Sequence, residues 1–273
     1  MPGQETPTKS EGAVELSIVA PAHNEEPNIA PLVADISRAL AGSGLNFEMI
    51  VVDDGSTDGT RQRLREQMAE HAWLRCVGLV GTMRGRGHGQ SAAFYAGIRC
   101  ARGELIALID ADRQNDPADL PAMVRLLRER GADMVQGDRS ACRADGAARK
   151  FSSWVGRTFR RAVLGDTIRD TGCSLRVLRR ELGLKLPLQY RGMHRFIPFY
   201  ARMLGCRVLE VDVRHRQRTA GQAKYGMWDR ALPGLRDLFA VRWMRSRLRP
   251  VDYELVQGQA TVTRPKSEET ALR

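Results

Sequence analysis

The feature that most constrains this chain is a regular alternation of short apolar runs and amphipathic segments between residues 14 and 138. Runs rich in Val, Ile and Leu predict strands over 16–20, 47–52, 74–79 and 105–109, and a fifth strand begins at Met134. Apolar residues at helical spacing predict the intervening helices, over 27–40, 58–70, 90–101 and 117–130. Such repeated β-α-β units favour an α/β fold, with a mostly parallel sheet and helices on both faces.

Polar residues cluster where three of the predicted strands end. The segments are 23–25 (His-Asn-Glu), 53–54 (Asp-Asp) and 110–112 (Asp-Ala-Asp). Ligands of parallel α/β sheets bind at the carboxyl ends of the strands. The sequence therefore predicts a binding site at this edge of the sheet.

Asp110 and Asp112 follow an entirely apolar strand, which predicts that they face a shared ligand. Hard carboxylate oxygens suit Mg²⁺ or Mn²⁺, and such ions usually also hold substrate phosphates. The structural alternative is a helix-capping loop before Pro117. Asp53 ends another apolar strand and could reach a ribose or a base, whereas Asp58 reads as the cap of the next helix.

Charge is distributed unevenly along the 273 residues. Residues 1–138 hold 14 Lys and Arg against 20 Asp and Glu, whereas residues 139–273 hold 29 against 12. The basic half contains an amphipathic stretch over 139–161, a strand over 207–213 and a basic amphipathic stretch over 228–248. A nucleic-acid-binding protein is one interpretation of this charge, but the segment lacks a zinc-finger, ribonucleoprotein or helix-turn-helix signature.

Composition also restricts the location. The sequence holds no run of ~18–20 apolar residues, and its first ten residues are too polar for a secretory signal. The five cysteines are scattered without a Cys-x-x-Cys pair, which favours free thiols in a reducing cytoplasm. We therefore expect a cytoplasmic protein whose membrane contact is peripheral or through a partner.

Several ordered motifs resemble those of the family 2 inverting glycosyltransferases. Within that family the chain is most similar to the branch of dolichol-phosphate mannose synthases and polyprenyl-phosphate glycosyltransferases, over roughly residues 14–230. The resemblance implies a glycosyltransferase A-type fold, a UDP- or GDP-linked sugar donor and a polyprenyl-phosphate acceptor. The motifs lie at 18–25, 51–58, 110–117, 170–175, 193–198 and 218–226.

The resemblance also implies roles for individual residues. It assigns the nucleotide sugar to Pro21, Ala22, Asn24, Glu25, Asp53, Gly89, Gln90, Asp110 and Ala111. It assigns a Mg²⁺ or Mn²⁺ ion to Asp110, Asp112 and Gln114, and catalysis to Asp112, Gln114 and Asp170. It assigns the acceptor phosphate to Arg139, Arg149, Ser153, Arg218 and Lys224.

Some of these assignments have alternatives. The glycine-rich segment 87–92 is either the family's donor-side loop or a turn that caps the next helix. His23 replaces the usual Tyr, which leaves the base preference open. Arg113 stands where a small or apolar residue is common, so it either adds a cation beside the diphosphate or points to solvent. Asp170 is a base, a structural anchor or a turn residue.

The expected organisation is a polar tail (1–13), a catalytic domain (14–227), a basic membrane-surface helix (228–249) and a second polar tail (250–273). The catalytic domain divides into a nucleotide-sugar half (14–138) and an acceptor half (139–227). An acceptor phosphate is already anionic, so in-line attack with inversion needs positioning and metal more than a strong base. The alternatives are a soluble glycan or protein acceptor and a catalytically lapsed scaffold.

Overall fold

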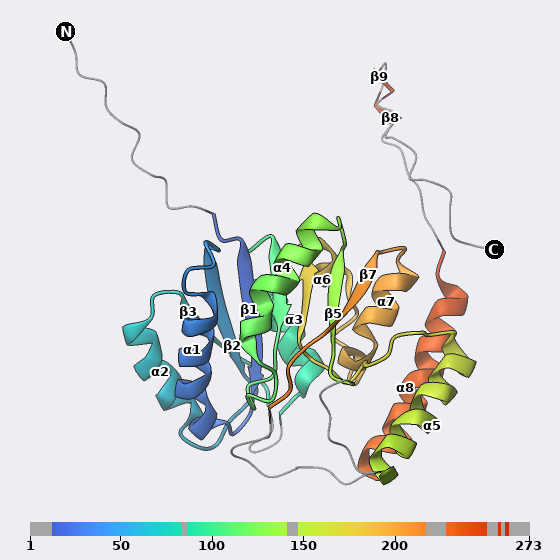
Figure 1. Cartoon of the computed structure of the whole chain (residues 1–273), viewed down its shortest axis with the longest axis horizontal. Helices are drawn as coiled ribbons and strands as arrows, with labels where there is room; N and C mark the ends of the chain where they lie inside the picture. Colours follow the sequence, from blue (N-terminus) through green and yellow to red (C-terminus); the bar gives the residue numbers. More distant parts are fainter. Residues whose placement is uncertain are drawn as a thin grey trace.

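A seven-stranded sheet forms the centre of the computed structural model, which describes residues 13–82, 87–140, 147–216, 228–249, 256–257 and 260–261 (Figure 1). The strand order is β3-β2-β1-β4-β6-β5-β7. The strands are β1 (Leu16–Ala22), β2 (Phe47–Asp53), β3 (Leu74–Gly78), β4 (Leu105–Leu108), β5 (Met134–Asp138), β6 (Arg176–Arg179) and β7 (Val208–Asp212).

The prediction of a mostly parallel sheet is confirmed, with one antiparallel strand that the sequence did not reveal. Strands β1 to β4 pair in parallel, as do β5 and β7, whereas β6 lies antiparallel between β4 and β5. The strand β6 is only four residues long and has Arg176 and Arg179 at its ends. It therefore offers neither an apolar run nor a period of two.

Helices cover both faces of the sheet, as expected. Ile29 and Leu32 of α1, Leu64 of α2 and Leu127 of α4 pack on one face. Helices α3, α6 and α7 pack on the other face with parts of α5 and α8. The helices are α1 (Glu26–Leu40), α2 (Thr60–Glu70), α3 (Gln90–Cys100), α4 (Leu120–Glu129), α5 (Ala147–Leu164), α6 (Arg180–Lys185), α7 (Ile197–Met203) and α8 (Trp228–Arg247), with 3₁₀ turns η1 (Pro117–Asp119) and η2 (Met193–Phe196).

Two local expectations were inaccurate. The first strand is longer than the predicted range 16–20, because β1 continues to Ala22 and Pro21 pairs with Val52 of β2. The pairing of β1 with β4 ends at Val19 and Leu108, so Pro21 has no partner in β4. The missing N–H of this proline therefore costs no hydrogen bond of the sheet. Asp58 stands before the N-cap Gly59 rather than at it, although its carboxylate accepts the amide of Thr60 at 3.0 Å.

The basic half supplies strands β6 and β7 of the sheet and the helix pair α5 and α8. Helix α8 packs against α5, and Arg242 and Arg245 of α8 donate to the carbonyls of Val163 and Leu164 at the carboxyl end of α5. These cations stabilise the negative end of the α5 dipole. No helix in the described ranges combines the length and the apolar character that a membrane span requires. In the second expected tail, β8 (Val256–Gln257) and β9 (Ala260–Thr261) form a short antiparallel pair.

Candidate functional site

The polar strand ends meet at the carboxyl edge of the sheet, which is the lower edge in Figure 1. Parallel pairing places Ala22 beside Asp53 and Val19 beside Leu108. The segments 23–25, 53–54 and 110–112 therefore leave the sheet side by side, as the sequence predicted. The antiparallel β6 begins at this same edge, so residues 173–175 lie there as well.

Asp53 is fully buried and carries a charge that the protein compensates. One carboxylate oxygen accepts a hydrogen bond from the main-chain amide of Ser56 at 3.0 Å. The other accepts hydrogen bonds from Nε and Nη2 of Arg61 at 2.9 and 2.5 Å. Burial tends to raise the pKa of Asp53, but hydrogen bonds from Ser56 and Arg61 hold it below its usual value. Asp53 is therefore an ionised group, and Arg61 is a contact that the sequence did not reveal.

Asp54 organises the glycine-rich segment that the sequence singled out. Its two carboxylate oxygens accept the amides of His88 and Gly89, each at 2.7 Å. A Cβ on Gly87 would lie 2.2 Å from the same carboxylate, so only glycine fits there. Gly89 has φ +97° and is the N-cap of α3. The segment thus caps α3, as one alternative predicted, and Asp54 holds it against the strand ends; its contact with a donor remains a prediction.

Asp110 lies beside the start of α3. Its Oδ1 accepts Nε2 of Gln90 at 2.5 Å. Burial and the neighbouring charge of Asp112 raise the pKa of Asp110 to about 6, although a hydrogen bond from Ser174 and the charges of Arg139 and Arg176 oppose this. A divalent cation would relieve this effect on Asp110, because it compensates the charge of both carboxylates.

The donor set at this point fits a hard metal ion. Asp110 and Asp112 supply carboxylate oxygens, and Gln114 supplies an amide oxygen on the same loop. Within the residues the structure describes, no group of three or more His, Cys, Asp or Glu side chains is arranged to hold a metal. A metal here would therefore rely on the two carboxylates, the amide and oxygens of a bound diphosphate.

Arg113 takes neither of the two orientations that the sequence suggested. Its backbone is left-handed, with φ +62°, and its guanidinium donates to Oδ2 of the buried Asp35 on α1 at 2.9–3.1 Å. Arg216 donates to the same oxygen at 2.9 Å, and its amide donates to the carbonyl of Gln114 at 2.8 Å. Asp35 thereby anchors the 112–114 loop and the segment that follows β7.

The residues after β1 hold the neighbouring turn in place. Asn24 has φ +55°, and its side-chain oxygen accepts the amide of Thr57 at 2.8 Å. The amide of Glu25 donates to Thr60 Oγ1 at 2.9 Å, and its carboxylate accepts Nδ2 of Asn28 at 2.6 Å. Pro21 and Ala22 are the last residues of β1, and Ala111 is buried between the two acidic residues.

Asp170 and Arg139 form a buried ion pair. Nε of Arg139 donates to Oδ2 of Asp170 at 2.8 Å, and Nη2 donates to Oδ1 at 3.2 Å. Burial tends to lower the pKa of Arg139, but the hydrogen bond and charge of Asp170 raise it. The pair joins the end of β5 to the segment before β6, an arrangement that suits a structural anchor.

The other residues assigned to the acceptor are less fully defined. Arg149 and Ser153 lie in helix α5, where side chains are described from Val155 onward. Arg218 and Lys224 lie outside the described residues. These four assignments remain predictions.

Sequence reasoning missed a second cluster beside Asp110. Ser91 Oγ lies 2.8 Å from Nδ1 of His194 and accepts the His194 amide at 3.1 Å. Burial lowers the pKa of His194 to about 3, with the charges of Arg195 and Arg176 adding to the effect, so the imidazole is neutral. The buried Arg176 donates to the carbonyls of His194 and Cys173. The partners are far apart in the chain, so no local pattern could have paired them.

A family comparison agrees with this geometry. The model named "Glycosyl transferase family 2" matches residues 17–184, which include every strand end described above as well as Asp170 and β6. The chain belongs to glycosyl transferase family 2. The resemblance that the motifs implied is thereby confirmed.

Curated relatives within the family act on polyprenyl phosphates according to their names. The chain is 39% identical to a dodecaprenyl-phosphate galacturonate synthase from Rhizobium johnstonii, over 87% of this chain and 70% of the relative. It is 34% identical to an undecaprenyl-phosphate 4-deoxy-4-formamido-L-arabinose transferase from Aeromonas hydrophila, over 78% of this chain and 63% of the relative. The matched region is thus less than two thirds of the second relative's length.

Solved structures share the fold at lower identity. Glucosyl-3-phosphoglycerate synthase from Mycobacterium tuberculosis superposes with a TM-score of 0.61 at 23% identity, covering 90% of this chain and 84% of that one. A mannosyltransferase from Pyrobaculum calidifontis, in complex with GDP-Man and Mn²⁺, gives 0.58 at 20% identity, covering 86% and 70%. These matches establish the glycosyltransferase A-type fold that the sequence predicted.

Proposed function

We propose that this chain transfers a sugar from a nucleotide-sugar donor to a polyprenyl phosphate, with inversion at the anomeric carbon. The observation that carries the proposal is the convergence of Asp53, Asp110 and Asp112 at one sheet edge in a chain of this family. The acceptor class rests on the relatives, whose names specify dodecaprenyl and undecaprenyl phosphate. A soluble glycan or protein acceptor is the competing outcome.

Asp110, Asp112 and Gln114 would hold Mg²⁺ or Mn²⁺, an assignment supported by the metal-bound structures of the same fold. When bound, the ion would neutralise charge on the departing nucleoside diphosphate. Gln90 fixes one oxygen of Asp110, and the amide of Gln114 fixes Oδ1 of Asp112 at 3.2 Å. The protein thereby presents these ligands in a fixed geometry before substrate arrives, which lowers the cost of organising them.

The acceptor half would bind the phosphate through its arginines and lysines. Arg139, Arg149, Ser153, Arg218 and Lys224 remain our assignment for this contact. An acceptor phosphate oxygen is anionic near neutral pH, so attack on the anomeric carbon needs no strong base. We therefore assign Asp170 to positioning, because its carboxylate already holds both the main chain and the guanidinium of Arg139.

The surface of α5 and α8 supports a peripheral membrane position. Phe239 and Trp243 are 55% and 62% exposed, and they lie next to other exposed apolar side chains, Val155, Phe159 and Leu235. Among the described side chains of these helices, the exposed arginines are Arg157, Arg161, Arg236, Arg242, Arg245 and Arg247, and the exposed Arg249 follows α8. Among the side chains described on these helices, Asp237 is the only acid. Apolar groups flanked by arginines suit the surface of an anionic bilayer.

The proposed location is the cytoplasmic face of that membrane. Nucleotide sugars are water-soluble anions. A site at the carboxyl edge of the sheet, held close to a bilayer surface, would let the phosphate of a membrane lipid reach them. The cysteines that the structure describes, Cys76, Cys100, Cys173 and Cys206, are all free thiols, which suits a reducing compartment.

The decisive experiment is a transfer assay with purified protein, Mn²⁺ or Mg²⁺, and undecaprenyl phosphate in detergent. The donors would include UDP- and GDP-linked hexoses, a uronic acid donor and a 4-amino-4-deoxypentose donor. We expect release of nucleoside diphosphate together with a sugar-linked lipid for at least one donor. The proposal would be overturned if no donor were consumed, or if a soluble glycan or protein were glycosylated while lipid phosphate stayed inert.

A further inference from the structure

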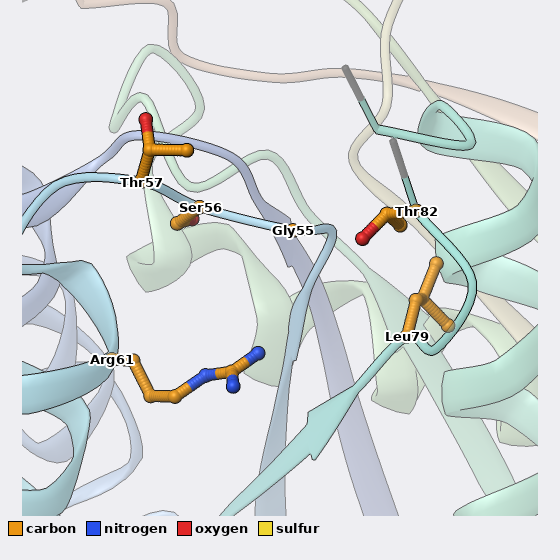
Figure 2. A pocket seen from close by; sticks show the side chains of 6 residues that line it. All are labelled: Gly55, Ser56, Thr57, Arg61, Leu79 and Thr82. Carbon is orange, nitrogen blue, oxygen red and sulfur yellow. The ribbon is translucent and has the colours of Figure 1, made fainter. Parts of the chain in front are cut away.

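Arginines pair with buried carboxylates at two places near the ends of the parallel strands. At the end of β2, the guanidinium of Arg61 reaches from α2 toward β2 beside a cavity of about 480 Å³ (Figure 2), and it pairs with Asp53. After the end of β4, Arg113 and Arg216 share one oxygen of Asp35. The first pair spans 8 residues of chain, whereas the partners of Asp35 lie 78 and 181 residues further along. Asp35 therefore joins segments that the chain itself does not hold together.

Arg113 lies at the centre of the metal loop, residues 112–114, between the proposed ligands Asp112 and Gln114. Its φ of +62° is in the left-handed region, which a residue with a Cβ adopts at a cost. Nε and Nη2 of Arg113 donate to Oδ2 of Asp35 at 3.1 and 2.9 Å, and the Arg113 side chain is 24% exposed. These hydrogen bonds favour the left-handed conformation, and that conformation sets the direction of Gln114 relative to Asp112.

Arg216 connects the same carboxylate to the segment that follows β7. Nη1 of Arg216 donates to Oδ2 of Asp35 at 2.9 Å, and Nη2 donates to Oδ1 of Asp116 at 2.7 Å. The same oxygen of Asp116 accepts the amide of Ala118 at 3.0 Å, which caps the turn η1. One guanidinium therefore joins α1, the chain after β4 and the chain after β7.

The main chain after β7 also runs beside the metal loop. The amide of Arg216 donates to the carbonyl of Gln114 at 2.8 Å, and Asn115 and His215 form an antiparallel bridge. Arg218, which we assign to the acceptor phosphate, follows two residues after Arg216 in the sequence. A displacement of the metal loop would therefore also displace the start of the acceptor segment.

The charge of Asp35 holds this arrangement together. Asp35 is 7% exposed, and burial tends to raise its pKa, but Arg113, Arg216 and Arg38 hold the pKa below its usual value. Without the carboxylate charge, the two guanidinium groups that share Oδ2 would repel each other. Arg38 has a different place, because it binds Oδ1 at 3.0 Å from within α1 and its side chain is 74% exposed.

We infer that Asp35 is a positioning residue of the transfer reaction, which acts through Arg113 and Arg216 to fix the metal loop and the start of the acceptor segment relative to each other. The inference rests on the proposed function, because it concerns the loop that would bind the metal. Mg²⁺ demands near-octahedral geometry. A small displacement of the loop therefore weakens metal binding even when every ligand is retained.

The test is a Mn²⁺ titration of the metal-free protein, with free Mn²⁺ followed by electron paramagnetic resonance. We expect Asp35→Asn to raise the Kd for Mn²⁺ about tenfold, the lower end of the effect of removing an outer-shell partner. In the transfer assay the KM for Mn²⁺ should rise by a similar factor, while kcat at saturating Mn²⁺ should change less than about twofold.

Arg38→Gln is the matched control, because it removes an ion pair of the same carboxylate that stays within α1. This variant should bind Mn²⁺ as the unmodified protein does. An equal loss of affinity in Arg38→Gln would overturn the inference, because the effect would then come from the charge balance of α1 and not from the loop. Unchanged Mn²⁺ affinity in Asp35→Asn, with a lower unfolding temperature, would also overturn it and leave Asp35 a purely structural residue.

A second variant keeps the test decisive if Asp35→Asn fails to fold. Arg216→Gln removes a side chain that is 39% exposed, so it disturbs the interior less, and it should weaken Mn²⁺ binding several-fold. Unchanged Mn²⁺ affinity in this variant would overturn the inference and leave the proposed transfer reaction standing. Failure of the unmodified protein to bind Mn²⁺ would instead overturn the metal site of the proposed function.

Discussion

The sheet divides into a β1–β4 side and a β5–β7 side, and the two sides hold their charged groups in different ways. On the β1–β4 side, Asp54 and Asp112 accept hydrogen bonds from main-chain amides, and Asp110 accepts one from the neutral side-chain amide of Gln90. On the β5–β7 side, Arg139 pairs with Asp170 and the buried Arg176 donates to main-chain carbonyls, whereas most of the described arginines of α5 and α8 are exposed. Composition predicts the net charge of each part of the chain. The structure is needed to tell charged groups that the protein itself holds by hydrogen bonds or ion pairs from those that are exposed to a ligand.

This difference suggests two kinds of binding. Carboxylates fixed by main-chain donors are rigid and suit a metal with strict geometry. Exposed arginines around apolar side chains keep their guanidinium groups in water, which suits a lipid surface whose phosphates have no fixed positions. The predictions below test this contrast, beginning with the largest expected effect.

Asp112→Ala should lower turnover more than about 100-fold, because removing a direct metal ligand lowers activity more than removing an outer-shell partner of such a ligand. Release of nucleoside diphosphate measures the effect, and thermal unfolding tests whether the fold persists. Glu129→Gln is the control, since Glu129 is an exposed acid on α4. If Asp112→Ala kept normal turnover, the carboxylates at this edge of the sheet would not be needed for the reaction, and the prediction would be wrong.

Asp170→Asn should reduce the free energy of unfolding by about 3–5 kcal/mol, because it leaves the buried guanidinium of Arg139 without its counter-ion. Combining it with Arg139→Gln should recover part of the loss, since the two residues act as a pair. Chemical denaturation measures both effects. A large fall in kcat at unchanged stability would instead identify Asp170 as a base.

Phe239→Ser together with Trp243→Ser should weaken binding to anionic vesicles at least about tenfold, because two exposed apolar side chains leave the lipid interface. Co-sedimentation with phosphatidylglycerol and with phosphatidylcholine vesicles measures this, and added salt should weaken the first more. Val80→Ser is the control, as Val80 is 88% exposed but lies near the nucleotide side. Unchanged vesicle binding with loss of self-association would assign the surface to a second copy of the chain.

Lowering the pH through about 6 should weaken metal binding, because burial and Asp112 raise the pKa of Asp110 to about 6 and its protonated form is a poor ligand. The decline should reach about tenfold per pH unit at most. The sign for stability is opposite: a raised folded pKa stabilises the metal-free protein at low pH, and this contribution is lost as pH rises through 6. Asp110→Asn should abolish both dependences, as followed by Mn²⁺ titration and metal-free thermal unfolding at pH 5 and 7.

Much of the nucleotide side could be predicted from local pattern. Strand periodicity and acidic strand ends place Asp53, Asp110 and Asp112 together, because parallel strands end at a common edge. Partners of those groups could not be predicted in the same way. Arg61 is one of many charged residues on α2, and the Ser91–His194 contact spans 103 residues of chain.

The acceptor side yielded less to sequence reasoning. The strand β6 was missed because its position depends on neighbours from β4 and β5 rather than on its own four residues. On the nucleotide side, too, no local pattern predicts that Arg113 adopts a left-handed conformation, since its partner Asp35 lies on a helix 78 residues earlier in the chain. Tertiary contacts decide these features, and local propensity is silent on them.

The place of β6 has a consequence for synthesis of the chain. Since β6 separates β4 from β5, the central ladder stays open until the ribosome has released residue 179. A nascent chain that ends near residue 140 would expose the edge of β4 as a template for another strand. Such truncated products should therefore aggregate or recruit chaperones, whereas release of the segment 176–179 should join β4 to β5 before β7 adds to the far edge of β5.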